Sequence, residues 1–546
     1  MRLILFAIFL NIAQYTNAQP ATRADVLRGG QSPERTCYDV KSYDLQLHVD
    51  TLTRAINGSN RIAFEVVNDF TTLQIDLFSN MEIARITSGG NELTFRREYN
   101  AVFVDMPVVQ KHGEQSAITV YFHGKPIIAK NPPWDGGFSW TRDEKGKQWI
   151  AVSCQGIGAS LWWPCKDDLS DEPDSMNIHC NVANGLRCVA NGKEEPATIG
   201  TDGTTTYHWS ISYPINNYNV SINIGDYVQV HDNYTAADGD TLSLDYYVLS
   251  YNMQKAVKQF AQVKPMLACY EKYLGKYPFW RDGYALVETP YLGMEHQGAI
   301  AYGNKFKTGY AGMDRSGMKL KFDYIIIHET GHEWWGNSVS ARDLADMWIH
   351  ESFCTYSEAI YVECMHDYDT AMTYVNALRT TVANKQPIIG TYGINREGHS
   401  DMYVKGMLFL NTMRHVVNND DLWWSMIKNM SDTTFKMSGV DYTEVVKFFN
   451  EKSGLNLSPV FEQYVKYPAI PRFQYKLKKK GDAYELSYRW MAEVKDFEMP
   501  LDVFVAGKKQ RLQPTMKWKK EILSMSGEGE FKVNEREFYV KVDRES

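Results

Sequence analysis

The spacing of apolar residues changes along the chain, and each change predicts a different kind of structure. From about residue 43 to about residue 230, apolar and polar residues alternate in short runs such as YDLQLHV, and turn signals such as NG separate the runs. A period of two is typical of β-strands with one buried face. We therefore expect a β-rich N-terminal domain over residues 19–235.

A helical spacing replaces this alternation from about residue 250 onwards. Long segments with apolar residues three and four positions apart include residues 321–337 and 403–417. After the turn-forming sequence YPAIP the period of two returns, as in YELSYRW, for roughly the last 75 residues. The pattern predicts a mostly helical domain over residues 236–468 and a small β-sandwich over residues 469–546.

The first 18 residues, MRLILFAIFLNIAQYTNA, have the layout of a secretory signal peptide. Arg2 precedes an apolar run, and small or polar residues follow it at Thr16 and Ala18. The run is too short for a stable membrane anchor, and no later segment approaches the roughly twenty apolar residues of a spanning helix. We expect an exported protein, periplasmic or extracellular, with no membrane span in the mature chain. A buried N-terminal helix is the alternative.

Composition and charge narrow the classes of partner. The 546 residues are 44% hydrophobic, enough for several packed cores, and their formal net charge of −8 makes nucleic acid an unfavourable partner. Basic clusters at residues 476–480 and 517–520 fit a solvated sheet face. Eight cysteines permit disulfides in an exported chain. Cys180 and Cys188 are the first pair to test, either bonded or buried and free.

One motif predicts a catalytic metal site. His328, Glu329 and His332 form HETGH, and Glu351 follows after eighteen intervening residues. Side chains four apart on a helix lie one above the other, so both imidazoles can bind one metal ion, and Trp335 extends the same face. Two histidines and one glutamate are a ligand set of catalytic zinc, which keeps one position open for water. The alternative is a helix with two hydrogen-bonded core histidines.

Such a site implies hydrolysis. Zinc lowers the pKa of its bound water toward neutrality, and an adjacent carboxylate can take the proton as the water attacks a carbonyl group. Glu329 is the expected base and Glu351 the expected third ligand. Asp346 and Glu358 can orient the ligands from behind, or they can form surface salt bridges.

Three more polar residues lie in surroundings that suggest a function. Glu295 lies in GMEHQ among small and apolar residues, and Gln155 lies in SCQGIGASLWWPCKDD. A carboxylate in such a place can pair with a substrate's ammonium group, or it can be an ordinary turn residue. Tyr403 opens the helical segment YVKG. Its hydroxyl can donate to the oxyanion of a tetrahedral intermediate, and packing is the alternative role.

In this order the motifs resemble those of the zinc aminopeptidases, a group of gluzincins that includes aminopeptidase N and leukotriene hydrolase. That family carries GxMEN, HExxH with eighteen residues to a glutamate, and YxKG, where this chain has GMEHQ, HETGH, WIHESF and YVKG. The resemblance implies a multidomain α+β fold with an N-terminal β-saddle domain, a thermolysin-like catalytic domain and a C-terminal β-sandwich. The large helical C-terminal domain of many relatives has no counterpart in the sequence, which implies a more open cleft.

The resemblance also implies the function and the roles of single residues. It implies an aminopeptidase with one catalytic Zn²⁺ that removes single residues from peptides with a free N-terminus. By their positions in the motifs, Glu295 and Gln155 would hold the α-amino group beside Gly293 and Met294. Tyr403 would steady the oxyanion. A zinc endopeptidase and a catalytically lapsed, metal-stabilised binding protein are the alternatives.

Three residues depart from the pattern of the family. His296 stands where Asn usually follows the glutamate, His350 replaces Asn before Glu351, and Ser352 replaces Gly after it. None of the three is an expected ligand, base or amine anchor. The sequence therefore does not specify which N-terminal residue is preferred.

Overall fold

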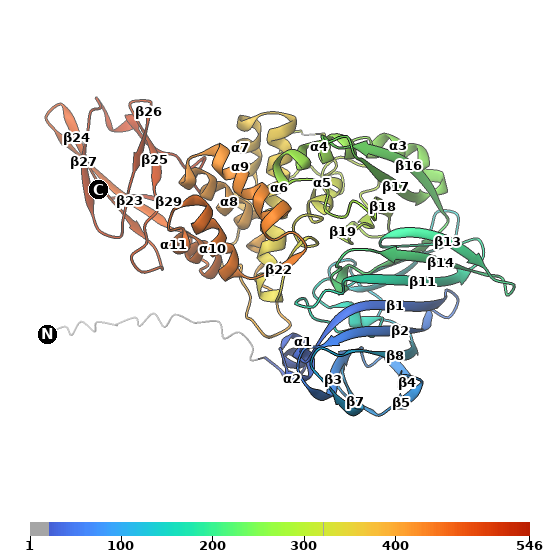
Figure 1. Ribbon diagram of the computed structural model, residues 1–546. Coiled ribbons are helices and arrows are strands. Elements are labelled where there is room, and N and C mark those ends of the chain that lie inside the picture. Colours follow the sequence, from blue (N-terminus) through green and yellow to red (C-terminus); the bar gives the residue numbers. More distant parts are fainter. Residues whose placement is uncertain (1–20, 320, 546) are drawn as a thin grey trace, which may run out of the picture.

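The computed structural model describes residues 21–319 and 321–545 (Figure 1). The predicted signal peptide, residues 1–18, lies outside the described residues. Within the described ranges, no helix combines the length and the apolar character needed to cross a membrane. The chain runs from a β-rich part through a cluster of helices to a pair of small sheets (Figure 1).

The N-terminal part consists of β-sheets, as the alternating pattern predicts. Two short helices, α1 (Arg23–Gly29) and α2 (Pro33–Thr36), precede an eight-stranded sheet of order β13-β14-β11-β1-β2-β8-β4-β5. Alternate residues of its central strand β1 are buried, which matches the period of two in YDLQLHV. Its strands are β1 (Tyr38–Asp50), β2 (Ala55–Val66), β4 (Met81–Ser88), β5 (Asn91–Leu93), β8 (Gln115–Gly124), β11 (Ser175–Ala183), β13 (Lys193–Ile199) and β14 (Thr204–Ile211).

Two smaller sheets complete this part. One has the order β3-β7-β6 and the other β12-β15-β10-β9, and both pack against the large sheet in one hydrophobic core. Their strands are β3 (Phe70–Asp76), β6 (Phe95–Glu98), β7 (Ala101–Gln110), β9 (Gly137–Arg142), β10 (Gln148–Ser153), β12 (Arg187–Ala190) and β15 (Ile222–Gly225).

A five-stranded sheet separates this core from the helices. Along its middle strand, Tyr284 and Leu286 pack into the helical core, whereas Ala285 and Val287 pack into the N-terminal core. Both faces are buried, so the strand is a continuous apolar run from Tyr284 to Val287, before Glu288 at its end, rather than an alternating one. The boundary predicted after residue 235 falls in the turn between the first two strands of this sheet. In order, its strands are β16 (Tyr227–Thr235), β17 (Thr241–Leu249), β18 (Tyr284–Glu288), β20 (Ile300–Tyr302) and β19 (Gly293–Met294).

Helices dominate the next part of the chain, as expected from the apolar spacing. The buried helices α5, α6 and α8 lie at its centre, and α6 contacts both of the others. The helices are α3 (Met253–Phe260), α4 (Val263–Leu274), α5 (Tyr324–Gly331), α6 (Met347–Met365), α7 (Tyr368–Ala377), α8 (Val404–Val417), α9 (Asp420–Asn429), α10 (Tyr442–Ser453) and α11 (Ser458–Lys466), with the short strand pair β21 (Val339–Ala341) and β22 (Ser438–Val440).

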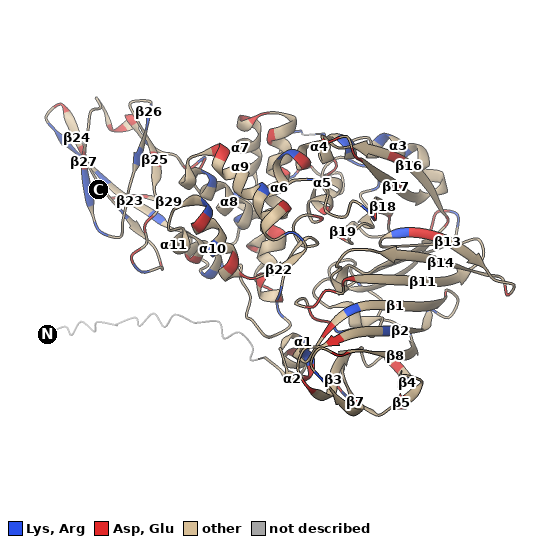
Figure 2. Ribbon diagram, viewed as in Figure 1, with Lys and Arg blue, Asp and Glu red and all other residues tan. Residues whose placement is uncertain are grey.

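After α11, the described residues form two small sheets and one short 3₁₀ turn, of orders β27-β24-β23-β29 and β26-β25-β28. Their inner residues join the same hydrophobic core as the helices. The lysines at residues 478–480 are exposed at the end of β23, as a solvated sheet face requires. Figure 2 shows the positions of Lys and Arg on these C-terminal strands in blue. The strands are β23 (Arg472–Lys480), β24 (Ala483–Met491), β25 (Leu501–Val505), β26 (Lys508–Leu512), β27 (Lys519–Leu523), β28 (Phe531–Val533) and β29 (Lys541–Arg544).

All eight cysteines are free thiols in the structure. Cys180 on β11 and Cys188 on β12 are both buried, so of the two alternatives for this pair the structure shows the buried, unbonded one.

Candidate metal centre and active site

Helix α5 brings the two histidines of HETGH together. The Asp323 side chain caps the helix by accepting a hydrogen bond from the Ile325 amide. The Nε2 atoms of His328 and His332 lie 3.3 Å apart. The α-helix ends at Gly331, so the expectation that it continues to Trp335 is wrong, because the residues after Gly331 follow a series of turns.

Glu351 supplies a third donor from α6, which begins four residues before it at Met347. Its Oε2 atom lies 3.8 Å from Nε2 of His328 and 3.4 Å from Nε2 of His332. Ligands at about 2.0–2.2 Å from a tetrahedral zinc ion are separated by roughly 3.3–3.6 Å. Oε2 of Glu351 is also buried and has no hydrogen-bond partner among the described residues. The three donors therefore fit one zinc ion, which would satisfy this oxygen.

The Nδ1 atom of each imidazole has a hydrogen-bond partner on the side away from the metal site. Nδ1 of His328 lies 2.8 Å from Glu358, and Nδ1 of His332 lies 2.8 Å from the carbonyl of Trp335. These contacts leave both Nε2 atoms for the metal. Glu358 thus has the expected orienting position. Trp335 orients His332 through its backbone carbonyl and does not extend the face of helix α5.

Asp346 does not orient a ligand, and that expectation was wrong. Its carboxylate accepts hydrogen bonds from the Trp348 indole and the Tyr392 hydroxyl, and it also contacts the Tyr442 amide. Asp346 precedes α6, so its side chain ties the start of that helix to α10. It is fully buried, which also excludes a surface salt bridge.

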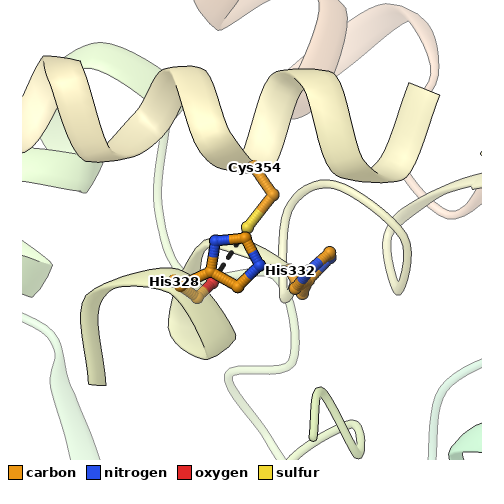
Figure 3. Close-up of side chains that lie close together, drawn as sticks. All are labelled: His328, His332 and Cys354. Atoms are coloured by element: carbon orange, nitrogen blue, oxygen red, sulfur yellow. Dashed lines mark hydrogen bonds between the residues drawn. The ribbon is translucent and has the colours of Figure 1, made fainter. Parts of the chain in front are cut away.

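Cys354 lies close to both histidines but is not the third donor. It projects from α6 toward α5, and its thiol donates a hydrogen bond to the carbonyl of His328 at 2.9 Å (Figure 3). The thiol therefore already has a partner in the helix backbone. The Nδ1 contacts described above leave the Nε2 atoms of both imidazoles facing Glu351 instead.

Glu329 lies beside the proposed ligands. Carboxylate oxygens of Glu329 and Glu295 and a ring nitrogen of His332 all lie within 4.8 Å of one another. Burial raises the pKa of Glu329, which suits a carboxylate that has to accept a proton near neutral pH. Gly293 lies against the Glu329 carboxylate, because a Cβ atom at Gly293 would lie 2.8 Å from a Glu329 oxygen. A larger residue at Gly293 would push against the carboxylate.

A second carboxylate, Glu295, closes one end of the site. It is 3% exposed and accepts hydrogen bonds from Nε2 of Gln155 at 2.7 Å and from the Tyr218 hydroxyl at 3.1 Å. Asn337 holds its backbone carbonyl at 2.9 Å. Burial raises the pKa of Glu295. Neither Tyr218 nor Asn337 was identified from the sequence, because neither lies in a motif that specifies a partner so distant along the chain.

Tyr403 is the N-cap of α8 and reaches the metal ligands. Its hydroxyl donates to Oε1 of Glu351 at 2.8 Å, and its ring centre lies 6.2 Å from that of His328. Burial and then the neighbouring Glu351 charge raise its pKa well above the usual value, so the hydroxyl keeps its proton. The hydroxyl is therefore available as a hydrogen-bond donor in the site.

The rest of YVKG positions Tyr403. Ser352 donates to the carbonyl of Met402 at 2.8 Å, which ties α6 to the start of α8. A Cβ atom at Gly406 would lie 1.9 Å from the Ser352 hydroxyl oxygen, so the two helices need glycine here. Lys405 points away from the site and donates to the carbonyl of Tyr467 at 2.8 Å.

The two unusual histidines are buried and neutral. Burial lowers the pKa of His296 to about 3, and neither ring nitrogen has a hydrogen-bond partner in the part of the chain that the structure describes. Burial and then the charge of His332 lower the pKa of His350 to about 3, and its Nε2 accepts from the Ala341 amide at 2.7 Å. His296 and His350 are the sequence neighbours of Glu295 and Glu351, but neither histidine lines the cavity.

The expected metal ligands, base, amine anchor and oxyanion donor line one cavity of about 600 Å³, a size typical of a small-ligand site. The cavity contains all nine residues expected at the site, which are Gln155, Gly293, Met294, Glu295, His328, Glu329, His332, Glu351 and Tyr403. They come from five separate parts of the chain, and β19, the edge strand of its sheet, runs along one wall.

The chain matches two consecutive family models. Residues 40–218 match the peptidase M1 N-terminal domain, and residues 258–464 match the peptidase family M1 domain. Together the two matches cover more than half of the chain.

Curated relatives include aminopeptidases. The chain is 22% identical over 496 residues to the leucyl aminopeptidase of Saccharolobus solfataricus, with 86% of this chain and 59% of that protein covered. It is 21% identical over 422 residues to endoplasmic reticulum aminopeptidase 1 of Homo sapiens, with 72% and 44% covered. The chain spans about half the length of the curated relatives it matches.

Similar solved structures share the fold. A two-domain M1 zinc metallopeptidase bound to L-tryptophan has a TM-score of 0.68 at 18% identity, covering 81% of this chain and 96% of that chain. An M1 zinc metallopeptidase of Deinococcus radiodurans bound to a Tyr-Ser-Ala substrate has a TM-score of 0.67 at 18% identity, covering 80% and 95%. The expected fold, a β-rich N-terminal domain followed by a helical catalytic domain, is confirmed.

Proposed function

Because the chain belongs to the peptidase M1 family, we propose that it is a zinc-dependent aminopeptidase that hydrolyses the N-terminal peptide bond of peptides. The observation that carries the proposal is the position of Glu295. This buried carboxylate, held by Gln155 and Tyr218, lies next to the residues that fit a zinc ion. It can pair with a free α-amino group and so fix cleavage one residue from the end of the peptide.

The side chains divide the chemistry among them. A zinc ion bound by His328, His332 and Glu351 would supply a water molecule of lowered pKa and polarise the scissile carbonyl. Glu329 takes the proton from the attacking water and later passes it to the departing amine. The Tyr403 hydroxyl turns from Glu351 to donate to the oxyanion as it forms.

The register of cleavage tests the amine anchor. Replacing Glu295 by glutamine removes the charge that pairs with the substrate ammonium group, so kcat/KM on free-amine peptides should fall by about a hundredfold or more. N-acetylated versions of the same peptides should be resistant in the wild type. The products are measured by chromatography on a matched pair such as Leu-Gly-Gly and acetyl-Leu-Gly-Gly. Equal cleavage of the two peptides would favour an endopeptidase and contradict the proposed aminopeptidase function.

Replacing Tyr403 by phenylalanine tests the oxyanion donor. We expect kcat to fall by about a hundredfold with little change in KM, because the hydroxyl acts chiefly in the transition state. Steady-state kinetics on a leucine p-nitroanilide substrate measures both constants. The Tyr273→Phe variant, on the partly buried face of α4 away from the cavity, is the matched control. An unchanged kcat for Tyr403→Phe would leave this residue a packing role only.

We also propose that the enzyme acts outside the cytoplasm. The proposal rests on the sequence of residues 1–18, with its basic start, apolar run and small residues. N-terminal sequencing of the native protein should show a chain that begins near residue 19. A native chain that starts at Met1 in the cytoplasm would contradict it.

A further inference from the structure

Apart from the zinc ion proposed above, the positive charge of the catalytic cavity is concentrated at one side chain. Apart from the two imidazoles, Arg315 is the only cationic residue among the described residues that line the cavity. Six carboxylic acids line the same cavity. They are Asp135, Glu295, Glu329, Glu351, Glu397 and Asp401.

Arg315 lies in the segment between β20 and α5, at the mouth of the cavity. Its guanidinium carbon lies 5.3 Å from the ring centre of Tyr310 and 5.6 Å from that of Tyr324. These two rings pack edge to face at 5.3 Å and form a platform for the guanidinium. The side chain is solvent-exposed and makes no hydrogen bond or ion pair with any described residue. Its five N–H donors therefore remain free for a ligand.

The position of Arg315 relative to the amine anchor gives the direction of a bound peptide. Glu295 lies beside His332. Arg315 approaches from the other histidine, because Tyr324 stacks on the His328 ring with centres 5.2 Å apart. A peptide whose amino group pairs with Glu295 passes the ligand residues and continues toward Arg315. The guanidinium thus lies on the C-terminal side of the scissile bond.

We propose that Arg315 binds a substrate carboxylate on the C-terminal side of the scissile bond, an inference that rests on the proposed aminopeptidase function. The carboxylate is either the C-terminus of a short peptide or the side chain of an acidic residue. An extended peptide advances about 3.5 Å per residue, so the guanidinium is within reach of the first to third residue after the bond.

The charge of the cavity makes this position selective. Carboxylates elsewhere along the walls repel a second carboxylate, whereas the guanidinium can accept one in a two-pronged contact. An acidic cavity in which Arg315 is the one guanidinium among the described lining residues favours a substrate that is cationic at its N-terminus and anionic a few residues later. The enzyme is therefore a peptidase for short or acidic peptides in preference to peptides without such a carboxylate.

Two substrate pairs test the proposal and separate the two sources of the carboxylate. The first pair is Leu-Gly-Gly and its C-terminal amide, and the second is Leu-Asp-Gly-amide and Leu-Asn-Gly-amide. In at least one pair, we expect the carboxylate member to have a kcat/KM about tenfold higher in the wild type. In the Arg315→Ala variant that ratio should fall to about one, and Arg315→Lys should keep part of it.

Lys307→Ala is the matched control, because it removes one positive charge from the same exposed segment but not from the cavity lining. The ratio should stay at its wild-type value in this variant. Calorimetric dissociation constants for the same four peptides on the Glu329→Gln protein provide a readout that does not need turnover.

The outcomes distinguish this inference from the proposed function. A ratio near one for both pairs in the wild type, or a ratio unchanged in Arg315→Ala, overturns the role of Arg315 while the requirement for a free N-terminus still supports an aminopeptidase. Cleavage of the acetylated peptides contradicts the proposed aminopeptidase function itself. In that case the role of Arg315 is judged by the dissociation constants, and equal constants for the carboxylate and amide members of each pair contradict it.

Discussion

Replacing Glu329 by glutamine should lower kcat by about a thousandfold or more while the protein still binds one zinc ion. The amide has almost the same shape as the carboxylate but cannot accept the proton of the attacking water. The carboxylate lies beside His332 and Glu295 without being one of the three donors that fit the ion. The metal should therefore remain, and only the chemical step should slow. Steady-state kinetics on leucine p-nitroanilide and zinc analysis of the purified variant measure the two quantities.

Glu333→Gln is the matched control for this change. Glu333 follows α5 by two residues, and it lies outside the cavity, with its carboxyl bonded to the Tyr277 hydroxyl and the Gly298 amide. Burial raises its pKa to about 8, so a neutral amide replaces a group that is already largely protonated at neutral pH. We expect kcat within a few-fold of the wild type. A Glu329→Gln variant that turns over as fast as this control would exclude Glu329 as the base.

Removing the metal should abolish activity and also lower Tm. Without the ion, Oε2 of Glu351 is a buried oxygen with no hydrogen-bond partner among the described residues, and the carboxylates of Glu295, Glu329 and Glu351 lie close to the two imidazoles. A ligand that binds only the folded state stabilises it, so its loss destabilises the fold. Dialysis against a chelator should reduce kcat/KM by at least a thousandfold, and one equivalent of zinc should restore it.

The Glu351→Gln variant provides the second arm of this experiment. It should bind zinc at least tenfold more weakly, because a neutral amide replaces a charged ligand. Its thermal stability should respond less to added zinc than that of the wild type. Full activity in a preparation shown to be free of metal would contradict the assignment of all three donors.

The local patterns were sufficient for most of the fold class and for the centre of the site. The alternation in β1 and the helical spacing around His328 depend on neighbours within a few residues, and these neighbours set which face of an element is buried. The motif spacing specified the two imidazoles, because one helical turn separates them. The same locality explains the error at Trp335, since nothing in the spacing shows that the helix ends at Gly331.

Contacts between distant segments could not be read in this way. Tyr218 holds Glu295 from 77 positions away. The proposed role of Arg315 depends on the acidic residues that line the same cavity, and these come from distant parts of the chain. The wrong expectation for Asp346 has the same origin, because a carboxylate near Glu351 in sequence can turn to a different helix. Glu358, one of the two candidates, was correctly placed because α6 itself carries it toward His328.

The sequence by itself determined the order of β-rich and helical segments, the three zinc-fitting donors and the neighbouring carboxylates, since these depend on residue type and on periodic spacing along one element. Only the tertiary structure decided which groups orient each imidazole, which groups hold the amine anchor and that Arg315 lines the cavity. These choices depend on how β19, α5, α6 and α8 pack against one another, and packing places residues from remote parts of the chain within a few ångströms.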